Sequence, residues 1–113
     1  MHEVSLAEGI LKTVTEIAKT QNAQRITTIY LKIGKLSGIA QDPLEFAFEA
    51  ISRDSIAQNA KLVFEVPQIV LQCTKCNVDV KTKNFPAPCP KCGSTCVQIK
   101  SGFEFEILSM EIE

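Results

Sequence analysis

The stretch CTKCNVDVKTKNFPAPCPKC, residues 73–92, contains two Cys-x-x-Cys pairs separated by twelve residues. This spacing is close to that of zinc sites, in which a tight turn brings two thiolates three residues apart to one ion. Such a turn needs a residue that tolerates positive φ after its second cysteine, and Asn77 and Gly93 occupy those positions. The pattern therefore predicts a structural zinc site, closed to water by its four sulfur ligands. The ligands are Cys73, Cys76, Cys89 and Cys92.

The segment around these cysteines has too few large apolar side chains to bury a core of its own. Segments this short usually need a metal ion or disulfides to fold. We therefore expect residues 70–98 to form an inserted zinc-binding module that folds when it binds the metal. Five lysines lie near the cysteines in the sequence. A zinc ion with four thiolates has a formal charge of about −2, which explains these positive residues without a binding partner of the protein. They are Lys75, Lys81, Lys83, Lys91 and Lys100.

Two further interpretations of the cysteines stay open. One Cys-x-x-Cys pair alone could act as a redox dithiol, but the strand-to-helix pattern that surrounds a thioredoxin-like centre is missing here. Cys96 is the leftover thiol. We expect it to be a bystander, and the lesser alternative is a ligand that exchanges with Cys92.

Outside the cysteine segment, the chain alternates helical and strand patterns. Apolar residues at spacings of three and four predict a helix over residues 5–19, with Ser5 and Glu8 as a capping-box pair. Alternating apolar residues then predict a strand over residues 25–34. A second helix is expected to follow, with Asp42 as its N-cap and Pro43 as its first residue, continuing to about residue 53.

Two more strands complete the pattern. Residues 62–66 alternate, which predicts a strand that Pro67 either interrupts or confines to the edge of a sheet. Over residues 103–112 the alternation shifts by one position between Ile107 and Leu108, which indicates a bulge or a bend. The order of elements predicts an α+β fold, with two helices packed on one face of a small sheet of about three strands. This domain would comprise residues 1–69 plus 99–113, with the four-cysteine zinc module inserted.

Composition excludes several classes of function. The net charge of −1 offers no overall field to attract a phosphate backbone, so nucleic-acid binding is disfavoured. No apolar run approaches the roughly 18 residues of a membrane-spanning helix, and the first residues lack the features of a secretory signal. We therefore expect a cytoplasmic protein with no membrane partner. Thiols stay reduced in that compartment, so five cysteines favour metal binding over disulfides.

The N-terminus suggests a second metal site. His2 is the only histidine, and it lies next to the α-amine of Met1. The amine, the amide nitrogen of His2 and its imidazole can close fused chelate rings on a metal that favours square-planar nitrogen ligands, namely Ni²⁺ or Cu²⁺. Glu3 could add a carboxylate oxygen. The alternative is a terminal histidine with no role in metal binding.

The start Met1-His2-Glu3-Val4-Ser5, combined with the two Cys-x-x-Cys pairs, resembles the HypA family of nickel incorporation proteins. The resemblance covers the whole chain, including the closing strand that ends at Glu113. It implies a metallochaperone, not an enzyme, that delivers Ni²⁺ to [NiFe]-hydrogenase and in some organisms to urease. It also implies a nickel site and a zinc site. Nickel would be bound by Met1, His2 and Glu3, and zinc by Cys73, Cys76, Cys89 and Cys92.

The same resemblance implies the partners of the protein. They would be a HypB-like GTPase, the [NiFe]-hydrogenase large subunit and, in some organisms, urease accessory proteins. A zinc-ribbon adaptor that binds a protein or a nucleic acid, with His2 irrelevant, is the alternative function. A dithiol oxidoreductase is a weaker third option. No arrangement of nucleophile and base is visible in the sequence, and one terminal histidine offers little for acid–base catalysis.

Overall fold

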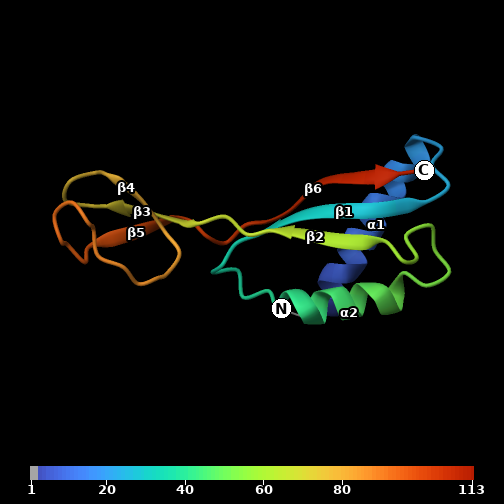
Figure 1. Ribbon diagram of the computed structural model, residues 1–113, viewed down its shortest axis with the longest axis horizontal. Helices are drawn as coiled ribbons and strands as arrows, with labels where there is room; N and C mark the ends of the chain where they lie inside the picture. The colour runs from blue at the N-terminus through green and yellow to red at the C-terminus, as the bar shows by residue number, and fades with distance from the viewer. Residues whose placement is uncertain (1–2) are drawn as a thin grey trace.

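The computed structural model, described for residues 3–113, is an elongated molecule of 54 × 25 × 16 Å with a three-stranded sheet at each end (Figure 1). The larger end contains both helices and the first sheet, and we call it the helical lobe (residues 3–68 and 102–113). The smaller end contains the second sheet and all five cysteines, and we call it the cysteine lobe (residues 69–101).

The first sheet has the strand order β2-β1-β6. The central strand β1 runs parallel to β2 and antiparallel to β6, so β2 lies at an edge as predicted. Tyr30 lies opposite Ser109 and Leu31 lies opposite Ile107, which leaves Leu108 as the extra residue of a bulge. The shift in alternation in the sequence is thereby explained. The bounds are Ile26–Ile33 for β1, Lys61–Glu65 for β2 and Phe105–Ile112 for β6.

Two helices, α1 (Glu3–Thr20) and α2 (Gln41–Ile51), cover one face of this sheet and form a single hydrophobic core with it. Ile10 of α1 and Phe48 of α2 are buried against the inward side chains of β1, such as Leu31. The prediction of an α+β fold with two helices and a three-stranded sheet is confirmed for this lobe. Among residues 3–113, neither helix combines the length and hydrophobicity of a membrane span.

Both predicted helix caps are wrong. Helix α1 begins at Glu3, so Ser5 lies within its first turn and is not the N-cap. Helix α2 begins at Gln41, preceded by Ala40, which makes no side-chain capping bond. Asp42 instead places its charge in the first turn, where it interacts favourably with the helix dipole, and a first turn also tolerates the missing N–H of Pro43. The capping residues correctly indicated both helices, but they placed the start of each helix two positions too late.

The second sheet has the order β4-β3-β5, with both neighbours antiparallel to β3. These three strands are not evident from the sequence, because they are short and only Ile69, Leu71 and Cys73 within them are buried. The sheet begins one residue before the inserted segment inferred from the sequence and ends three residues after it. The bounds are Ile69–Cys73 for β3, Asp79–Thr82 for β4 and Val97–Ser101 for β5.

At its boundary with the cysteine lobe, the helical lobe has a junction where the chain leaving β1 crosses the chain entering β6. The N–H of Gly34 donates to the carbonyl of Glu104 (2.8 Å), and the N–H of Leu36 donates to the carbonyl of Gly102 (2.8 Å). Gly34 is held so close to this second segment that a Cβ would lie 2.6 Å from the backbone nitrogen of Glu104. The junction is therefore built from close backbone packing.

Candidate metal centre

The two cysteine pairs lie in turns with the same backbone geometry. Asn77 and Gly93 follow the second cysteine of each pair and have φ values of 57° and 73°. Each donates its N–H to the carbonyl of the first cysteine, Cys73 (2.9 Å) or Cys89 (2.7 Å). The prediction of positive φ at both positions is confirmed.

A second backbone hydrogen bond is shared by the two turns. The N–H of Cys73 donates to the carbonyl of Val78 (3.0 Å), and the N–H of Cys89 donates to the carbonyl of Ser94 (2.9 Å). In both cases the first cysteine donates its N–H to the carbonyl five residues later and accepts at its own carbonyl from the N–H four residues later. Two backbone hydrogen bonds therefore close each turn. Equivalent turns present their two sulfurs in equivalent ways.

The turns bring all four thiols together. The Sγ atoms of Cys73, Cys76, Cys89 and Cys92 lie within 4.8 Å of one another. Sγ–Sγ distances are 3.5 Å between Cys73 and Cys92 and 3.6 Å between Cys76 and Cys89. A tetrahedron with Zn–S bonds of about 2.3 Å has sulfur–sulfur edges of roughly 3.8 Å. The four thiols are thus positioned to hold one metal ion, and their type and spacing fit structural zinc.

Backbone N–H groups stabilise the thiolate form of the first cysteine in each turn. The backbone N–H of Cys76 points at the Cys73 sulfur, with that of Lys75 in support, and lowers the pKa of Cys73 to about 6. The N–H groups of Cys92 and Lys91 lower the pKa of Cys89 in the same way. N–H groups directed at sulfur stabilise its negative charge, which a metal ligand requires.

The second cysteine of each turn has the opposite shift. Burial, followed by the neighbouring sulfurs of Cys73 and Cys89, raises the pKa of Cys76 to about 12. For Cys92 the N–H of Ser94 lowers the pKa, but the Cys73 sulfur, burial and the Cys89 sulfur outweigh it, and the net pKa is raised. Four thiolates this close repel one another, so full ionisation requires a cation between them.

The fifth cysteine, Cys96, is exposed and is not among the four thiols that lie together. Its carbonyl accepts hydrogen bonds from the N–H (3.0 Å) and Oγ1 (2.8 Å) of Thr74, so its backbone anchors the first cysteine turn. Both Cys-x-x-Cys pairs converge on one point, as a shared metal ion requires, whereas a redox centre would need only one pair.

The residues expected to bind nickel lie at the other end of the chain. Met1 and His2 are outside the described residues. Glu3 is the first residue of α1, where its carboxylate is half-buried and close to the positive end of the helix dipole. Within residues 3–113 the four cysteines are the only cluster of three or more potential metal-ligating side chains of the His, Cys, Asp and Glu types.

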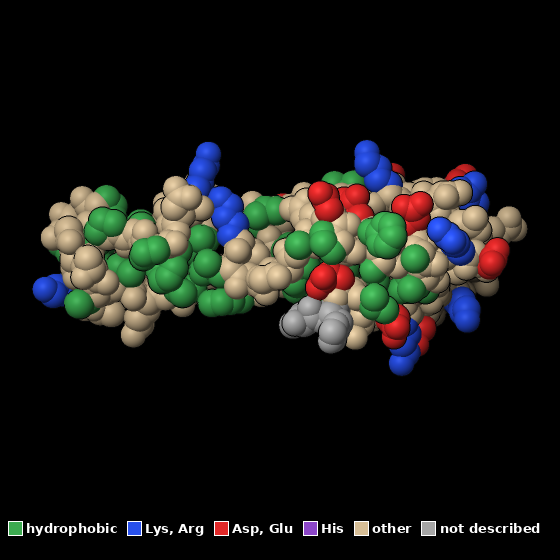
Figure 2. Space-filling model, turned by 90° about the horizontal axis from the view of Figure 1, so that it is seen from below, with side chains coloured by type: hydrophobic (Ala, Val, Ile, Leu, Met, Phe, Trp, Pro, Cys, Tyr) green, Lys and Arg blue, Asp and Glu red, His purple; other side chains and the backbone are tan. Residues whose placement is uncertain are grey.

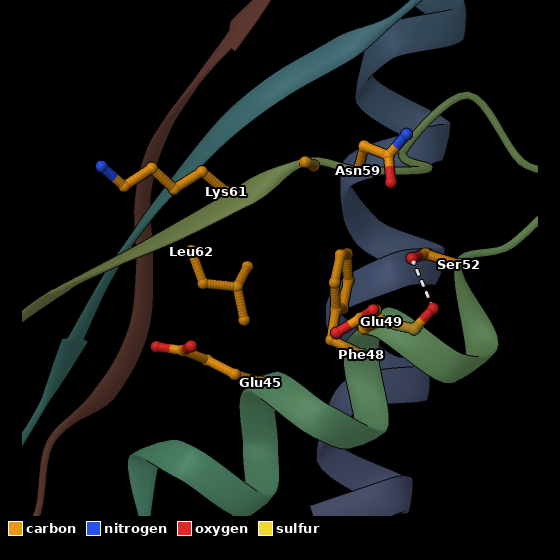
Figure 3. A pocket seen from close by; sticks show the side chains of 8 residues that line it. Glu45, Phe48, Glu49, Ser52, Asn59, Lys61 and Leu62 are labelled. Carbon is orange, nitrogen blue, oxygen red and sulfur yellow. Dashed lines mark hydrogen bonds between the residues drawn. The ribbon is translucent and has the colours of Figure 1, made fainter.

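The helical lobe has several hollows, one of which has a volume of about 330 Å³ and lies between α2 and β2 (Figure 3). Glu45 and Glu49 of α2 face Lys61 and Leu62 of β2 across it. Among its lining residues, the Ser52 hydroxyl donates a hydrogen bond to the Glu49 carbonyl at the end of α2 (3.4 Å). It offers no thiol or imidazole, and it was not indicated by the sequence.

The chain has a two-lobed α+β fold and four thiols spaced to hold one zinc ion. Its sequence also has a histidine directly after Met1. These features together are typical of small metal-binding proteins. A family model described as "Hydrogenase/urease nickel incorporation, metallochaperone, hypA" matches residues 1–112. The chain belongs to this family, whose members are nickel metallochaperones that act in hydrogenase maturation. The resemblance seen in the sequence is thereby confirmed.

Two relatives agree with this membership over all or nearly all of their length. The chain is 42% identical to "Hydrogenase maturation factor HypA" of Pelodictyon phaeoclathratiforme, covering 100% of the chain and 97% of the relative. It is 35% identical to the protein of the same name from Albidiferax ferrireducens, with both chains covered completely.

Solved structures show the same architecture. The solution structure of the Ni metallochaperone HypA from Helicobacter pylori has 28% identity and a TM-score of 0.66, covering 99% of this chain and 97% of that one. A second solution structure of a HypA protein has 29% identity and a TM-score of 0.75, covering 100% and 97%. The likeness therefore extends over both lobes.

Proposed function

We propose that this chain binds Ni²⁺ at its N-terminus through Met1, His2 and Glu3 and delivers it to the [NiFe]-hydrogenase large subunit, with a HypB-like GTPase as partner. Urease accessory proteins are the corresponding partners where the organism makes urease. The proposal has its main support in the membership of a nickel incorporation family over residues 1–112. The protein would transfer the ion by contact with partners and would catalyse no reaction of its own.

In this proposal the four cysteines hold zinc permanently. Cys73 and Cys89 are buried, and two closed backbone turns fix all four sulfurs around one point. Four thiolates leave no position for water or cargo on the ion, so zinc would supply folding energy to the cysteine lobe and no chemistry. We accordingly assign residues 70–98 as the zinc-binding module and residues 1–69 plus 99–113 as the nickel-binding domain.

The proposed nickel ligands suit an ion that must be released. The α-amine, the amide nitrogen and the imidazole of His2 must lose protons to bind nickel, so a fall in pH weakens the site. The four cysteines lie in two hydrogen-bonded turns far from the chain terminus and lack such a terminal location. The chemistry of the two donor sets thus matches one retained ion and one transferred ion.

A nickel titration of the zinc-loaded chain tests the proposal. The native chain is compared with His2→Ala and with a chain extended by two residues at its N-terminus. The extension converts the α-amine of Met1 into a peptide nitrogen. We expect both changes to weaken nickel binding more than about tenfold, or 1.4 kcal/mol, while zinc content stays constant. Glu16→Gln, an exposed carboxylate change on α1, is the matched control and should leave nickel affinity unchanged.

Equal nickel affinity in the native, extended and His2→Ala chains would contradict the N-terminal site. A loss of zinc in the His2→Ala variant would instead show that the change acts on the fold. The two outcomes are separated by measuring both metals in each sample.

A further inference from the structure

The four thiols of the metal centre differ in their exposure to solvent. Cys73 and Cys89 are buried, and Cys76 is half-buried. Cys92 is exposed. A thiol that coordinates a cation has lost its proton, and the thiolate is the form of cysteine that oxidants attack. With zinc bound as proposed, Cys92 is therefore the ligand that a dissolved oxidant reaches first.

A fifth thiol lies on the same loop as this exposed ligand. Cys96 is exposed and follows Cys92 by four residues, and the segment between them contains no helix or strand. Ser94 contacts both ends of the segment. Its N–H is directed at the Cys92 sulfur, and its Oγ accepts a hydrogen bond from the N–H of Cys96 (3.0 Å). One residue thus links the exposed ligand to the backbone of the fifth cysteine.

The backbone of Cys96 is also fixed to the first cysteine turn. Its carbonyl accepts hydrogen bonds from the N–H (3.0 Å) and Oγ1 (2.8 Å) of Thr74, the residue after Cys73. Strand pairing places Val97 opposite Cys73. Cys96 is therefore held beside the metal centre, although its sulfur is not one of the four that lie together. An exposed thiolate with a second thiol nearby is typical of cysteines that form reversible disulfides.

The charge around the metal centre favours a reactive thiolate. The cysteine lobe contains five lysines and one aspartate, so it stays positive even with the formal charge of about −2 of a four-thiolate zinc site. Lys91 directly precedes Cys92 and makes no ion pair within residues 3–113. In Figure 2 the acidic side chains gather over the helical lobe, and a basic side chain marks the free end of the cysteine lobe. Reactive cysteines occur in such electropositive, partly exposed surroundings.

We propose that Cys92 and Cys96 make the metal centre a redox-sensitive switch, in which a hydroperoxide joins their sulfurs in a disulfide and thereby weakens zinc binding. The switch rests on the zinc assignment of the four cysteines and is independent of nickel. While both sulfurs are reduced, Cys92 remains a ligand and the ion is retained. Once they are joined, the cysteine lobe loses the folding energy that the metal supplies.

The reaction balances in two steps with hydrogen peroxide as the oxidant. The Cys92 thiolate attacks one peroxide oxygen, the O–O bond breaks, a Cys92–SOH group forms and hydroxide leaves. The Cys96 sulfur then attacks the Cys92 sulfur, which forms the S–S bond and releases the hydroxyl group with the Cys96 proton as water. The two sulfurs together lose two electrons, and these reduce the peroxide. The oxidation state of zinc does not change.

Loss of one ligand opens the metal site. A disulfide sulfur carries no negative charge, so three thiolates remain and water can occupy the fourth position on the ion. Zinc affinity therefore falls, and a competing chelator removes the ion. A dithiol reductant exchanges with the disulfide and restores both thiols, so the change is reversible.

Treatment of the full-length, zinc-loaded chain with one equivalent of hydrogen peroxide in dilute solution tests the switch. Released zinc is measured with a chromogenic chelator, and disulfides are mapped by mass spectrometry after the free thiols have been alkylated. We expect a disulfide between Cys92 and Cys96 and zinc release in step with its formation. Dithiothreitol followed by added zinc should restore nearly all of the original zinc content.

Cys96→Ser removes the thiol that resolves the oxidised ligand. In this variant Cys92–SOH persists, so it can be labelled with dimedone, and excess peroxide converts it to a sulfinic acid that dithiothreitol does not reduce. After excess peroxide, zinc recovery should be at least about twofold lower than in the native chain. The matched control combines Cys96→Ser with Ser109→Cys, which keeps five cysteines but moves the fifth to an exposed position on β6. It should behave like Cys96→Ser.

Three results would overturn the switch. They are dimedone labelling of the other zinc ligands as often as Cys92, zinc recovery in Cys96→Ser equal to that of the native chain, and a main disulfide that joins Cys96 of two chains. Zinc content before peroxide treatment tests the four-cysteine assignment separately. The nickel titration uses reduced protein, so its outcome and that of the peroxide experiment are independent.

Discussion

Asn77 and Gly93 occupy the same position in two turns that are sixteen residues apart: each has positive φ and donates its N–H to the carbonyl of the first cysteine of its pair. The equivalence has a physical origin. A turn that directs its N–H groups at sulfur must reverse the chain within one residue, and that residue adopts the left-handed conformation. The metal site is therefore built by backbone conformation as much as by the thiols.

Replacement of Gly93 by alanine should weaken zinc binding through backbone strain alone. A Cβ at Gly93 would meet no atom within 4 Å, but its φ of 73° is unfavourable for alanine by about 1 kcal/mol. Zinc affinity, measured by competition with a chelator, should fall roughly fivefold. Gly9→Ala is the matched control, since Gly9 also has open space but lies within helix α1. Equal losses in the two variants would contradict this explanation.

Removal of one thiol should destabilise the cysteine lobe and leave the helical lobe folded. Cys73→Ser deletes a buried ligand, so we expect loss of bound zinc and loosening of residues 69–101. The helical lobe has its own hydrophobic core and should keep its native amide spectrum. Metal analysis and two-dimensional NMR of the labelled chain measure both effects. Cys96→Ser changes an exposed thiol outside the cluster and should retain full zinc, and loss of zinc from it would contradict the four-thiol assignment.

Zinc binding should release fewer protons than four ordinary thiols would release. The pKa of Cys73 is lowered to about 6, so near pH 7.5 this thiol is already ionised in the metal-free chain. The pKa of Cys76 is raised to about 12, so Cys76 must lose its proton when the metal binds. Affinity therefore rises with pH, and it falls more steeply below about pH 6, where Cys73 also becomes protonated.

Calorimetry in buffers of different ionisation enthalpy counts these protons directly. Release of fewer than four protons per zinc ion at pH 7.5 is the expected result. A count of four at that pH would mean that the backbone N–H groups do not stabilise the Cys73 thiolate. Cys96→Ser serves as the reference, because its proton count should equal that of the native chain.

The sequence predicted the features that depend on local patterns. Alternation identified β1 and the one-residue shift at Leu108, because side chains must alternate between the two faces of a half-buried sheet. Cysteine spacing and positive-φ residues identified both turns of the metal site, because a turn of this kind admits few residue types. These rules act within a few residues and need no knowledge of the rest of the fold.

Features that depend on distant contacts were not predictable in the same way. The strands of the cysteine lobe are short and only partly buried, so their pairing depends on the turns at their ends more than on hydrophobic pattern. Capping residues misplaced the helix starts, since packing of α1 and α2 on the sheet outweighs a capping bond of about 1 kcal/mol. The approach of Gly34 to Gly102 joins positions 68 residues apart, and no local rule indicates it.

That approach gives the last prediction, which concerns the chain crossing at the boundary between the lobes. An alanine Cβ at Gly34 would lie 2.5 Å from the carbonyl carbon of Gly102 and 2.6 Å from the nitrogen of Glu104, and closest to the Gly102 oxygen. All three atoms belong to the backbone, so no side chain can rotate away. The two segments must separate, which breaks the hydrogen bonds from Gly34 and Leu36 that join them.

We therefore expect Gly34→Ala to destabilise the protein by about 2–3 kcal/mol, the range for overpacking at a rigid site. Gly38→Ala is the informative comparison: Gly38 has a φ of 77° but nothing within 4 Å of its Cβ position, so its cost should be limited to about 1 kcal/mol of conformational strain. Chemical denaturation of the zinc-loaded chains measures the difference. If the two variants lose the same stability, steric contact at the crossing is not what destabilises Gly34→Ala. If Gly34→Ala alone also broadens the small-angle scattering profile, the crossing fixes the relative orientation of the two lobes.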